Sequence, residues 1–546
     1  MSPDYTLFVG TFIQLPRTKT GAEHQLAITR GALWVSTTDG QIKGFDWSIA
    51  NDKDLKNLLQ AKGWTVVDDS STKSKPGVKV TLVVAREDQN EFFFPGFIDT
   101  HIHAPQYPNS GLFGSSGLLS WLQTYTFPIE KSFGSTKLPS IPPPQAYRVY
   151  NQVIARTLAN GTTCASYFAT IHVPATNLLA TLCHARGQRA LIGRVCMDNP
   201  DHCPADYRDA SPSDALAATE ATIAHIRSLD PSAALLHPII TPRFAPSCTP
   251  PALTHLAHLA ASTSPPLHIQ THLSENLDEC ALVHSLFPTA KDYTSVYDHF
   301  GLLTPRTILA HGIHLSDSER HLIASRNAKL SHCPASNSAL GSGICQVRKA
   351  LDAGITVGLG TDVSGGYSPS VLETVRQACL VSRLLPQFNP PASSPTQSES
   401  QSTRTDPIPR EILSVEEALY LATRGGADVV DMGDQIGGFD LNMSWDAQLI
   451  KLGKFAPAGR WGARGGVEST VDVFGEESWT EKVHKWVWNG DDRNVRMVWV
   501  NGRLVHEVVP AGEVGKKGKG WKSWVWGVVG VGVVVWVVGR RVRGRN

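Results

Sequence analysis

The sequence predicts an α/β protein built on a closed (β/α)8 barrel of the TIM type, with a smaller β region contributed by each end of the chain. Eight short apolar runs between residues 96 and 361 alternate with helical or loop stretches, and strands that alternate with helices pair in parallel. Histidine or aspartate closes several of these runs, and barrel enzymes place their chemistry at the carboxyl ends of the strands. The alternative, an open doubly wound sheet, lacks a glycine-rich phosphate turn after its first strand.

The composition fits a globular enzyme. The 546 residues carry a net charge of +1 and are 41% hydrophobic, so the chain can bury a large core and has no charge excess that calls for a nucleic-acid partner. Nine cysteines without a Cys-x-x-Cys pair indicate reduced thiols rather than a disulfide framework. The N-terminus has no basic-then-apolar signal, so we expect a cytoplasmic protein rather than a secreted one.

Short alternating apolar runs near both ends of the chain predict the β region. A helix is predicted over 55–64, where Leu55, Leu58 and Leu59 fall on one helical face. Because the runs at the two ends are alike, they favour one shared region over an independent N-terminal domain. The runs lie at 7–10, 32–36 and 78–84, and at 447–450, 496–500 and 504–505.

The barrel elements follow in order between these ends. The predicted strands are 96–102, 161–168, 189–195, 235–241, 266–273, 307–312, 328–333 and 355–361. The predicted helices are 144–159, 212–228 and 371–385, and helical patterning returns at 415–423. Residues 386–410 have too few apolar groups to offset the entropy of ordering. We expect a disordered surface insert there, with a regulatory phosphosite as the alternative.

The ends of the strands predict a metal site. His101 and His103 stand two positions apart at the end of the first barrel strand, where period-2 geometry aims both imidazoles to one side. For such a motif taken alone, a chance pair on a half-buried strand is the alternative. His272, His311 and Asp362 each close a later apolar run, and this repetition favours a metal centre.

These five residues resemble the metal-site pattern of the amidohydrolase superfamily, and residues 95–106 and 241–244 are similar to the guanine deaminase family within it. The resemblance ends at 500–505 and leaves out the insert and the tail. It implies hydrolytic deamination of guanine to xanthine and ammonia, and a β-sandwich that both chain ends build beside the barrel. The implied domains are 1–92 and 441–510 for the sandwich and 93–440 for the barrel.

The resemblance also implies one zinc ion per chain, held by His101, His103, His272 and Asp362 with water at the open position. His311 then positions this water, and the alternative role, that of a fifth ligand, stays open. No lysine stands at the end of the fourth strand, where the sequence reads Thr-Pro-Arg-Phe. One metal is therefore preferred over two.

Glu275 is the candidate for acid and base catalysis. It stands three residues after His272, where a carboxyl group can take the proton of the water and deliver it to a ring nitrogen. Asp362 can carry a further proton toward the leaving ammonia. The alternative for Glu275 is a solvated carboxylate at a helix start. We also expect Glu275, Asp362, His103 and His272 to contact the substrate.

Gln106, Arg243 and Phe244 are the candidates for reading the substrate. A guanidinium presents donors only, so Arg243 suits the O6 carbonyl of guanine and would meet the 6-amino group of adenine donor to donor. The Gln106 amide can offer a donor and an acceptor together, and Phe244 can pack on the ring. A surface charge for Arg243 and an ordinary core aromatic for Phe244 are the alternatives. Residues 119–127 resemble the family segment that covers the substrate.

Two other functions stay open at this point. One is a related amidohydrolase that acts on a triazine, another purine or a pyrimidine. The other is a non-catalytic scaffold relative, against which the intact ligand set and Glu275 argue. The expected partners are guanine and water, without nucleic acid, and a homodimer is left open.

The tail, residues 511–546, departs from the family. Its apolar run at 524–538 has tryptophans near both ends and basic residues just outside, which is the interfacial pattern of a segment in or across a bilayer. We expect a C-terminal membrane anchor on an otherwise cytoplasmic enzyme. A strand, or a tail altered by a gene-model error, is the alternative.

Overall fold

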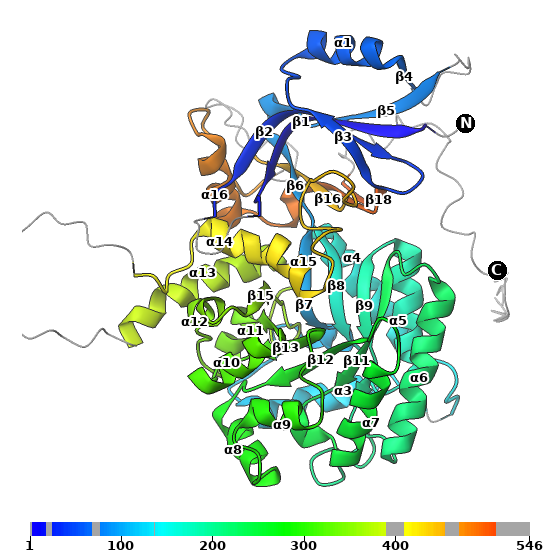
Figure 1. Ribbon diagram of the computed structural model, residues 1–546, viewed down its shortest axis with the longest axis vertical. Coiled ribbons are helices and arrows are strands. Elements are labelled where there is room, and N and C mark those ends of the chain that lie inside the picture. The colour runs from blue at the N-terminus through cyan, green and yellow to red at the C-terminus, as the bar shows by residue number, and fades with distance from the viewer. Residues whose placement is uncertain are drawn as a thin grey trace, which may run out of the picture. The chain divides into compact units, whose positions relative to one another are not determined.

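The computed structural model describes residues 3–17, 24–67, 77–135, 137–388, 409–453 and 469–508. The described residues up to Glu507 belong to one compact unit that contains two sheets. Figure 1 shows a mixed sheet, built from strands of both ends of the chain, next to a barrel that is ringed by helices. The predicted α/β class is therefore confirmed.

The barrel strands pair in parallel in the order β15-β14-β13-β12-β11-β9-β8-β7. The two ends of this sheet meet, because the His101 carbonyl accepts from the Asp362 amide at 2.8 Å and the His103 amide donates to the Val363 carbonyl at 2.9 Å. All eight predicted strands are present, and the third is divided into β9 and β10. The strands are β7 (Phe97–His103), β8 (Thr162–Phe168), β9 (Arg189–Gly193), β10 (Val195–Cys196), β11 (Leu236–Pro242), β12 (His268–Leu273), β13 (Thr307–His311), β14 (Lys329–His332) and β15 (Thr356–Leu359).

Several helices begin at a capping side chain or at a proline in the first turn, and the helices bury one face against the barrel. For α6, the Ser211 side chain accepts from the Asp214 amide and Pro212 stands in the first turn, as expected of a helix start. The helices around the barrel are α4 (Pro144–Ala159), α5 (Val173–Arg186), α6 (Pro212–Leu229), α7 (Pro250–Ala261), α8 (Leu277–Leu286), α9 (Tyr293–His299), α10 (Asp317–Ser325), α11 (Pro334–Ala339), α12 (Val347–Asp352), α13 (Val371–Phe388), α14 (Val415–Tyr420) and α15 (Gly426–Val429).

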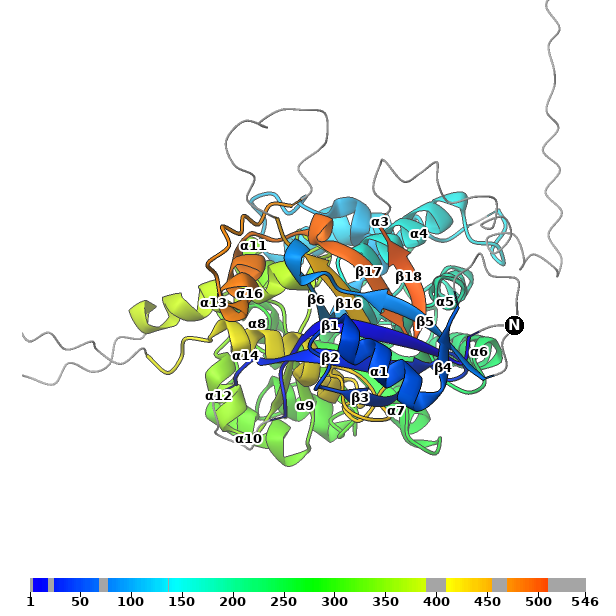
Figure 2. The ribbon, with the colours of Figure 1, turned by 90° about the horizontal axis from the view of Figure 1, so that it is seen from above.

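The second sheet joins the two ends of the chain, and Figure 2 shows the N-terminal strands beside β16, β17 and β18. β1 pairs with β2 on one edge, and on the other with β5 through its first half and with β6 at Phe12. Phe8, Phe12, Phe93, Trp445 and Trp499 pack into one aromatic core across these strands. The strands are β1 (Tyr5–Gln14), β2 (Ala27–Ser36), β3 (Ile42–Asp46), β4 (Trp64–Val66), β5 (Val78–Val84), β6 (Glu91–Pro95), β16 (Ala447–Lys451), β17 (Val495–Val500) and β18 (Arg503–Glu507).

Gly96 is the point at which the chain passes from the mixed sheet into the barrel, and one mixed sheet stands where a β-sandwich was expected. Its amide donates to the Asp446 carbonyl at 2.9 Å, and a Cβ at this position would lie 2.2 Å from the Thr163 hydroxyl oxygen. The predicted boundary at residues 92 and 93 falls inside β6, which pairs with β1 and β16 and so belongs to the mixed sheet.

Several other elements differ from the prediction. Helix α1 (Asp52–Lys62) ends at Gly63, whose left-handed backbone forms the C-cap, so the predicted helix over 55–64 starts and ends too late. Helix α16 (Trp479–Asn489) was not predicted. Helix α13 continues to Phe388 and takes in the first three residues of the predicted insert 386–410, of which residues 389–408 lie outside the described residues.

None of the helices in the described ranges is long and apolar enough to cross a bilayer. The predicted membrane anchor within 511–546 lies outside these ranges.

Candidate active site

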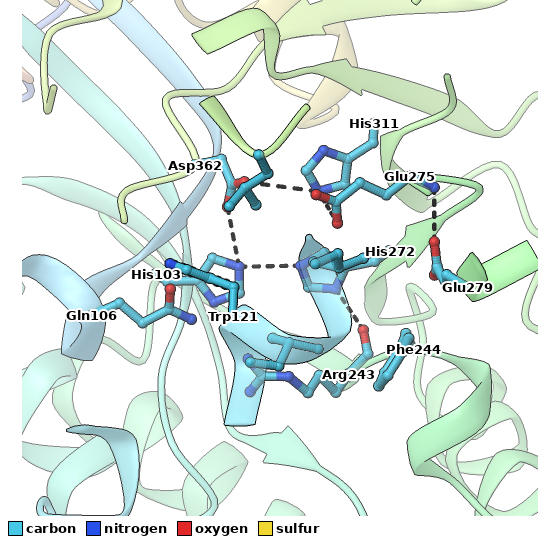
Figure 3. Close-up of a pocket in the computed structure, with 13 residues that line it drawn as sticks. His103, Gln106, Trp121, Arg243, Phe244, His272, Glu275, Glu279, His311 and Asp362 are labelled. Carbon is cyan, nitrogen blue, oxygen red and sulfur yellow. Dashed lines mark hydrogen bonds and ion pairs between the residues drawn. The ribbon is translucent and has the colours of Figure 1, made fainter. Parts of the chain in front are cut away.

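Four side chains direct possible metal-binding atoms to one place at the carboxyl ends of the barrel strands. His101 and His103 come from β7, His272 comes from β12, and Asp362 follows β15; one ligand atom of each lies within 4.8 Å of the others. His103 Nε2 is 3.1 Å from His272 Nε2, and Asp362 Oδ1 is 3.3 Å from His103 Nε2. Figure 3 shows these last three side chains facing one another.

The state of these groups fits a metal ion. Burial lowers the pKa of His101, His103 and His272, so each imidazole is neutral and keeps a lone pair for an ion. Burial alone would raise the pKa of Asp362, but the nearby histidines, His101 first, hold it below its usual range. His101 Nε2 is buried and lies 3.1 Å from Asp362 Oδ1. Three neutral nitrogens and one carboxylate suit a divalent transition metal.

Neighbouring groups orient the ligands. His272 Nδ1 donates to the Arg243 carbonyl at 2.6 Å, which leaves Nε2 as the atom for the ion. The buried Asp99 carboxylate accepts from the backbone amides of His101 at 3.3 Å and Thr361 at 3.0 Å. Asp99 therefore ties β7 to the segment that follows β15, so that ligands from both ends of the barrel sheet stay together.

Glu275 and His311 lie beside the ligand set. His311 Nε2 is 3.4 Å from Glu275 Oε2 and 3.8 Å from Asp362 Oδ2, and His311 is not one of the four clustered ligand residues. His311 Nδ1 donates to Asn337 Oδ1 at 2.9 Å, so Nε2 carries the lone pair that faces the centre. Burial, and then the charges of Asp362 and Glu279, raise the pKa of Glu275 well above its usual range. This carboxyl group can therefore hold a proton near neutral pH.

A pocket opens next to these groups. Its apolar wall includes Leu118 and Trp121 of α2 (Leu118–Trp121) and Leu122, the first residue of η3 (Leu122–Thr126). Trp121 and Leu122 belong to the segment 119–127, for which a covering role is predicted. The lining is completed by His103, Gln106, Arg243, Phe244, His272, Glu275, Glu279, His311, Leu340 and Asp362 (Figure 3).

Arg243 and Gln106 share a carboxylate behind the pocket. Arg243 Nη1 donates to Glu130 Oε2 at 2.7 Å and Nη2 donates to Oε1 at 3.2 Å, while Gln106 Nε2 donates to Oε1 at 2.7 Å. Burial acts to lower the pKa of Arg243, but the charge of Glu130 outweighs it and raises this pKa. Arg243 is 2% exposed, so the alternative of a surface charge is wrong.

Every side chain predicted for the site lies in this one region, and Glu130, Glu279 and Asn337 are among the contacting residues that were not predicted as site residues. Glu279 could have been found, because Asn276 and Glu279 have the spacing of a capping box at the start of α8. Glu130 and Asn337 carry no comparable local signal, since their partners are distant in the sequence.

The closed barrel, and the His/Asp ligand set at the carboxyl ends of its strands, fit a metal-dependent hydrolase. A family model described as the amidohydrolase family matches residues 92–505, and the chain belongs to this family. Within it, the chain is similar to guanine deaminases. It is 48% identical over 417 residues to a Schizosaccharomyces pombe protein named "Probable guanine deaminase", covering 76% of this chain and 71% of the relative. It is 41% identical over 423 residues to the guanine deaminase of Dictyostelium discoideum, covering 76% and 83%.

The chain is also similar to solved structures of guanine deaminases. The crystal structure of guanine deaminase from C. acetobutylicum, with guanine bound in the active site, is 30% identical and has a TM-score of 0.71; it is matched over its whole length and over 92% of this chain. The E. coli guanine deaminase structure is 26% identical, with a TM-score of 0.72 and the same coverage.

Proposed function

We propose that the protein is a zinc-dependent guanine deaminase that hydrolyses guanine to xanthine and ammonia. One observation carries the proposal: a single pocket is lined by three of the four clustered His/Asp residues, by the buried carboxyl group of Glu275 and by Arg243, whose guanidinium has donors only. The identity of 37–48% to guanine deaminases from yeast to human supports it.

Zinc is the metal that His101, His103, His272 and Asp362 suit best, because imidazole nitrogens and carboxylates are its usual ligands in hydrolytic sites. Zinc held there supplies the nucleophile, since it lowers the pKa of water from about 15.7 to roughly 7. We expect one ion per chain, because the residues Thr-Pro-Arg-Phe at the end of β11 include no lysine that could bridge two ions. Elemental analysis that finds two tightly held metals in active enzyme would contradict this stoichiometry.

Glu275 moves the first proton. It takes a proton from the attacking water and delivers it to a ring nitrogen as C2 becomes tetrahedral. Asp362 passes the second proton of the water to the amino group, which leaves as ammonia. His311, whose Nδ1 is held by Asn337, accepts from the attacking water through Nε2 and so orients it.

Arg243, Gln106 and Phe244 read the base. The Arg243 guanidinium donates to O6 of guanine, the Gln106 amide meets the polar ring edge, and Phe244 packs on the ring. His103 and His272 face the same space from the metal side. The 6-amino group of adenine is a donor, so it and Arg243 would face each other without an acceptor. A buried site binds a substrate with such unpaired donors much more weakly.

The second candidate is a deaminase that acts on another aminated ring, because the metal and Glu275 could activate water for attack on any such ring. Ammonia release from guanine, adenine, cytosine and a triazine separates these substrates. We expect guanine to exceed the others, and adenine turned over as fast as guanine would overturn the assignment. No release from any of them would favour a non-catalytic scaffold.

Two proposals rest on the sequence and the family resemblance alone. The tail 511–546 attaches an otherwise cytoplasmic enzyme to a membrane. The test is to compare the membrane and soluble fractions of the full chain with those of a chain that ends at Lys516. Equal solubility of the two without detergent would remove this proposal. A homodimer is the second, and sedimentation of the purified protein measures it.

A further inference from the structure

Glu130, in helix α3 (Phe127–Lys131), has no part in the mechanism above, yet its carboxylate is fully buried and meets four donors. Oε1 accepts from Gln106 Nε2 at 2.7 Å and from Arg243 Nη2 at 3.2 Å. Oε2 accepts from Arg243 Nη1 at 2.7 Å and from the Tyr207 hydroxyl at 2.8 Å. A carboxylate offers about four lone-pair sites, so each site has its donor.

A carboxylate is the group that these surroundings require. An amide at this position would point its NH2 group at an N–H of Arg243 whichever way it was turned, because Arg243 donates to both oxygens. The negative charge also balances the buried guanidinium of Arg243, which is 3% exposed at its side chain. Loss of that balance would leave a charge unpaired in the protein interior.

We propose that Glu130 is a positioning residue that sets the substrate specificity of this pocket. The inference rests on the proposed guanine deaminase function, in which Arg243 and Gln106 read the base. Glu130 acts through these two side chains and does not touch the base or the metal ligands.

The paired hydrogen bonds hold Arg243 in one plane, because two parallel N–H···O contacts define the orientation of a guanidinium. Its remaining N–H groups are left for a carbonyl of the substrate. The bond to Gln106 Nε2 decides which way the amide is turned, and Gln106 Oε1 then lies 3.4 Å from the Ser364 amide. An amide free to flip would offer donor and acceptor in either order and would distinguish purines poorly.

Glu130 also links the segment that covers the pocket to the residues that read the base. Glu130 lies in α3, which directly follows α2 and η3, and these carry Trp121 and Leu122 of the pocket lining. Glu130 is 113 residues from Arg243 in the chain. The Glu130 bonds therefore place the covering segment and the base-reading residues in one arrangement.

The test compares guanine with 2-aminopurine, which has the same 2-amino group and no O6 carbonyl. Glu130→Gln should lower kcat/KM for guanine by at least about 10²-fold, chiefly through KM, and change that for 2-aminopurine by less than about threefold. The metal content should be unchanged. A merely structural role would lower both by the same factor, so equal losses, or no loss, overturn the proposal.

Asp446→Asn is the matched control. Asp446 forms another buried paired contact, with Arg189 Nε and Nη2 at 3.1 and 3.2 Å, and does not line the pocket. This variant also loses a buried charge, and it should affect the two substrates alike.

Glu130→Asp is the second variant and decides the matter if the glutamine variant does not fold. Aspartate keeps the charge but is one methylene shorter, so it cannot reach Gln106 and both nitrogens of Arg243 together. A loss selective for guanine supports the proposal, and equal losses on the two substrates overturn it. A wild-type chain that does not deaminate guanine would instead remove the proposed function itself.

Discussion

Substitution of Glu275 should reduce turnover without loss of the metal. Its Oε1 is buried without a hydrogen-bond partner, and Oε2 is 3.4 Å from His311 Nε2, so the carboxyl group can exchange a proton with substrate. Glu275→Gln should retain the metal and lose kcat by ~10²-fold or more, because an amide cannot relay protons. Kinetics and elemental analysis of one sample measure both quantities. A near-normal kcat would exclude Glu275 from the mechanism.

Arg243 can be tested by a change that preserves its charge. Lysine keeps a cation beside Glu130 but replaces the planar fork by a single ammonium group. Arg243→Lys should lower kcat/KM for guanine by ~10²-fold while the metal content and the fold stay intact. A lysine variant with wild-type kcat/KM would contradict the role given to the guanidinium.

Arg243→Ala is the less selective change, because it leaves Glu130 buried and unpaired. Removing one partner of a buried ion pair costs about 3–5 kcal/mol, so this variant should also have a lower Tm. Comparison of the two variants separates recognition of the base from the stability of the pair.

At the scale of elements, the start of α8 holds Glu275 in place. Glu279 Oε2 accepts from the amides of Glu275 at 2.9 Å and Asn276 at 3.2 Å, and Oε1 accepts from the Tyr293 hydroxyl at 2.9 Å. Glu279→Leu should lower the free energy of unfolding by about 1–3 kcal/mol, because these buried donors lose their acceptor. It should also reduce kcat, since the backbone that carries Glu275 can shift.

Two variants control this prediction. Glu279→Gln keeps an oxygen toward the two amides, so it should recover most of the stability and of kcat. Ser478→Ala removes the cap of α16, where the serine hydroxyl accepts from the Glu481 amide at 3.3 Å; it should cost about 1 kcal/mol without changing kcat. Wild-type kcat for the leucine variant would show that the α8 cap does not position Glu275.

At the scale of the whole molecule, the ion pair between Asp446 and Arg189 joins the mixed sheet to the barrel. Asp446 precedes β16 and Arg189 begins β9, and both are buried. Asp446→Ala should cost about 3–5 kcal/mol, because the guanidinium is left buried without its partner. Urea unfolding monitored by tryptophan fluorescence measures this cost.

An exposed pair provides the comparison. Arg326 Nε is 2.6 Å from Asp298 Oδ1 and its side chain is 50% exposed, so Asp298→Ala should change stability by less than about 1 kcal/mol. Equal costs for the two aspartates would show that burial does not set the value of the inner pair.

The barrel could be predicted because its strands are short apolar runs bounded by turns, which is a local property. The same property did not locate the boundary between the mixed sheet and the barrel. Residues 92–98 form one apolar stretch, and only the pairing of β6 with β16 and of β7 with β8 shows that the chain changes sheets at Gly96. Helix α16 was missed although Ser478 and Glu481 form a capping box.

The sequence by itself determined the candidate ligands and Glu275, because period-2 spacing on a strand and a position at a strand end are both properties of neighbouring residues. Only the tertiary structure decided that Glu130 holds Arg243 and Gln106, that Asn337 holds His311, and that His311 stands beside the ligand set. Each of these contacts joins residues on different elements, and their distances depend on how the closed barrel and its covering helices pack.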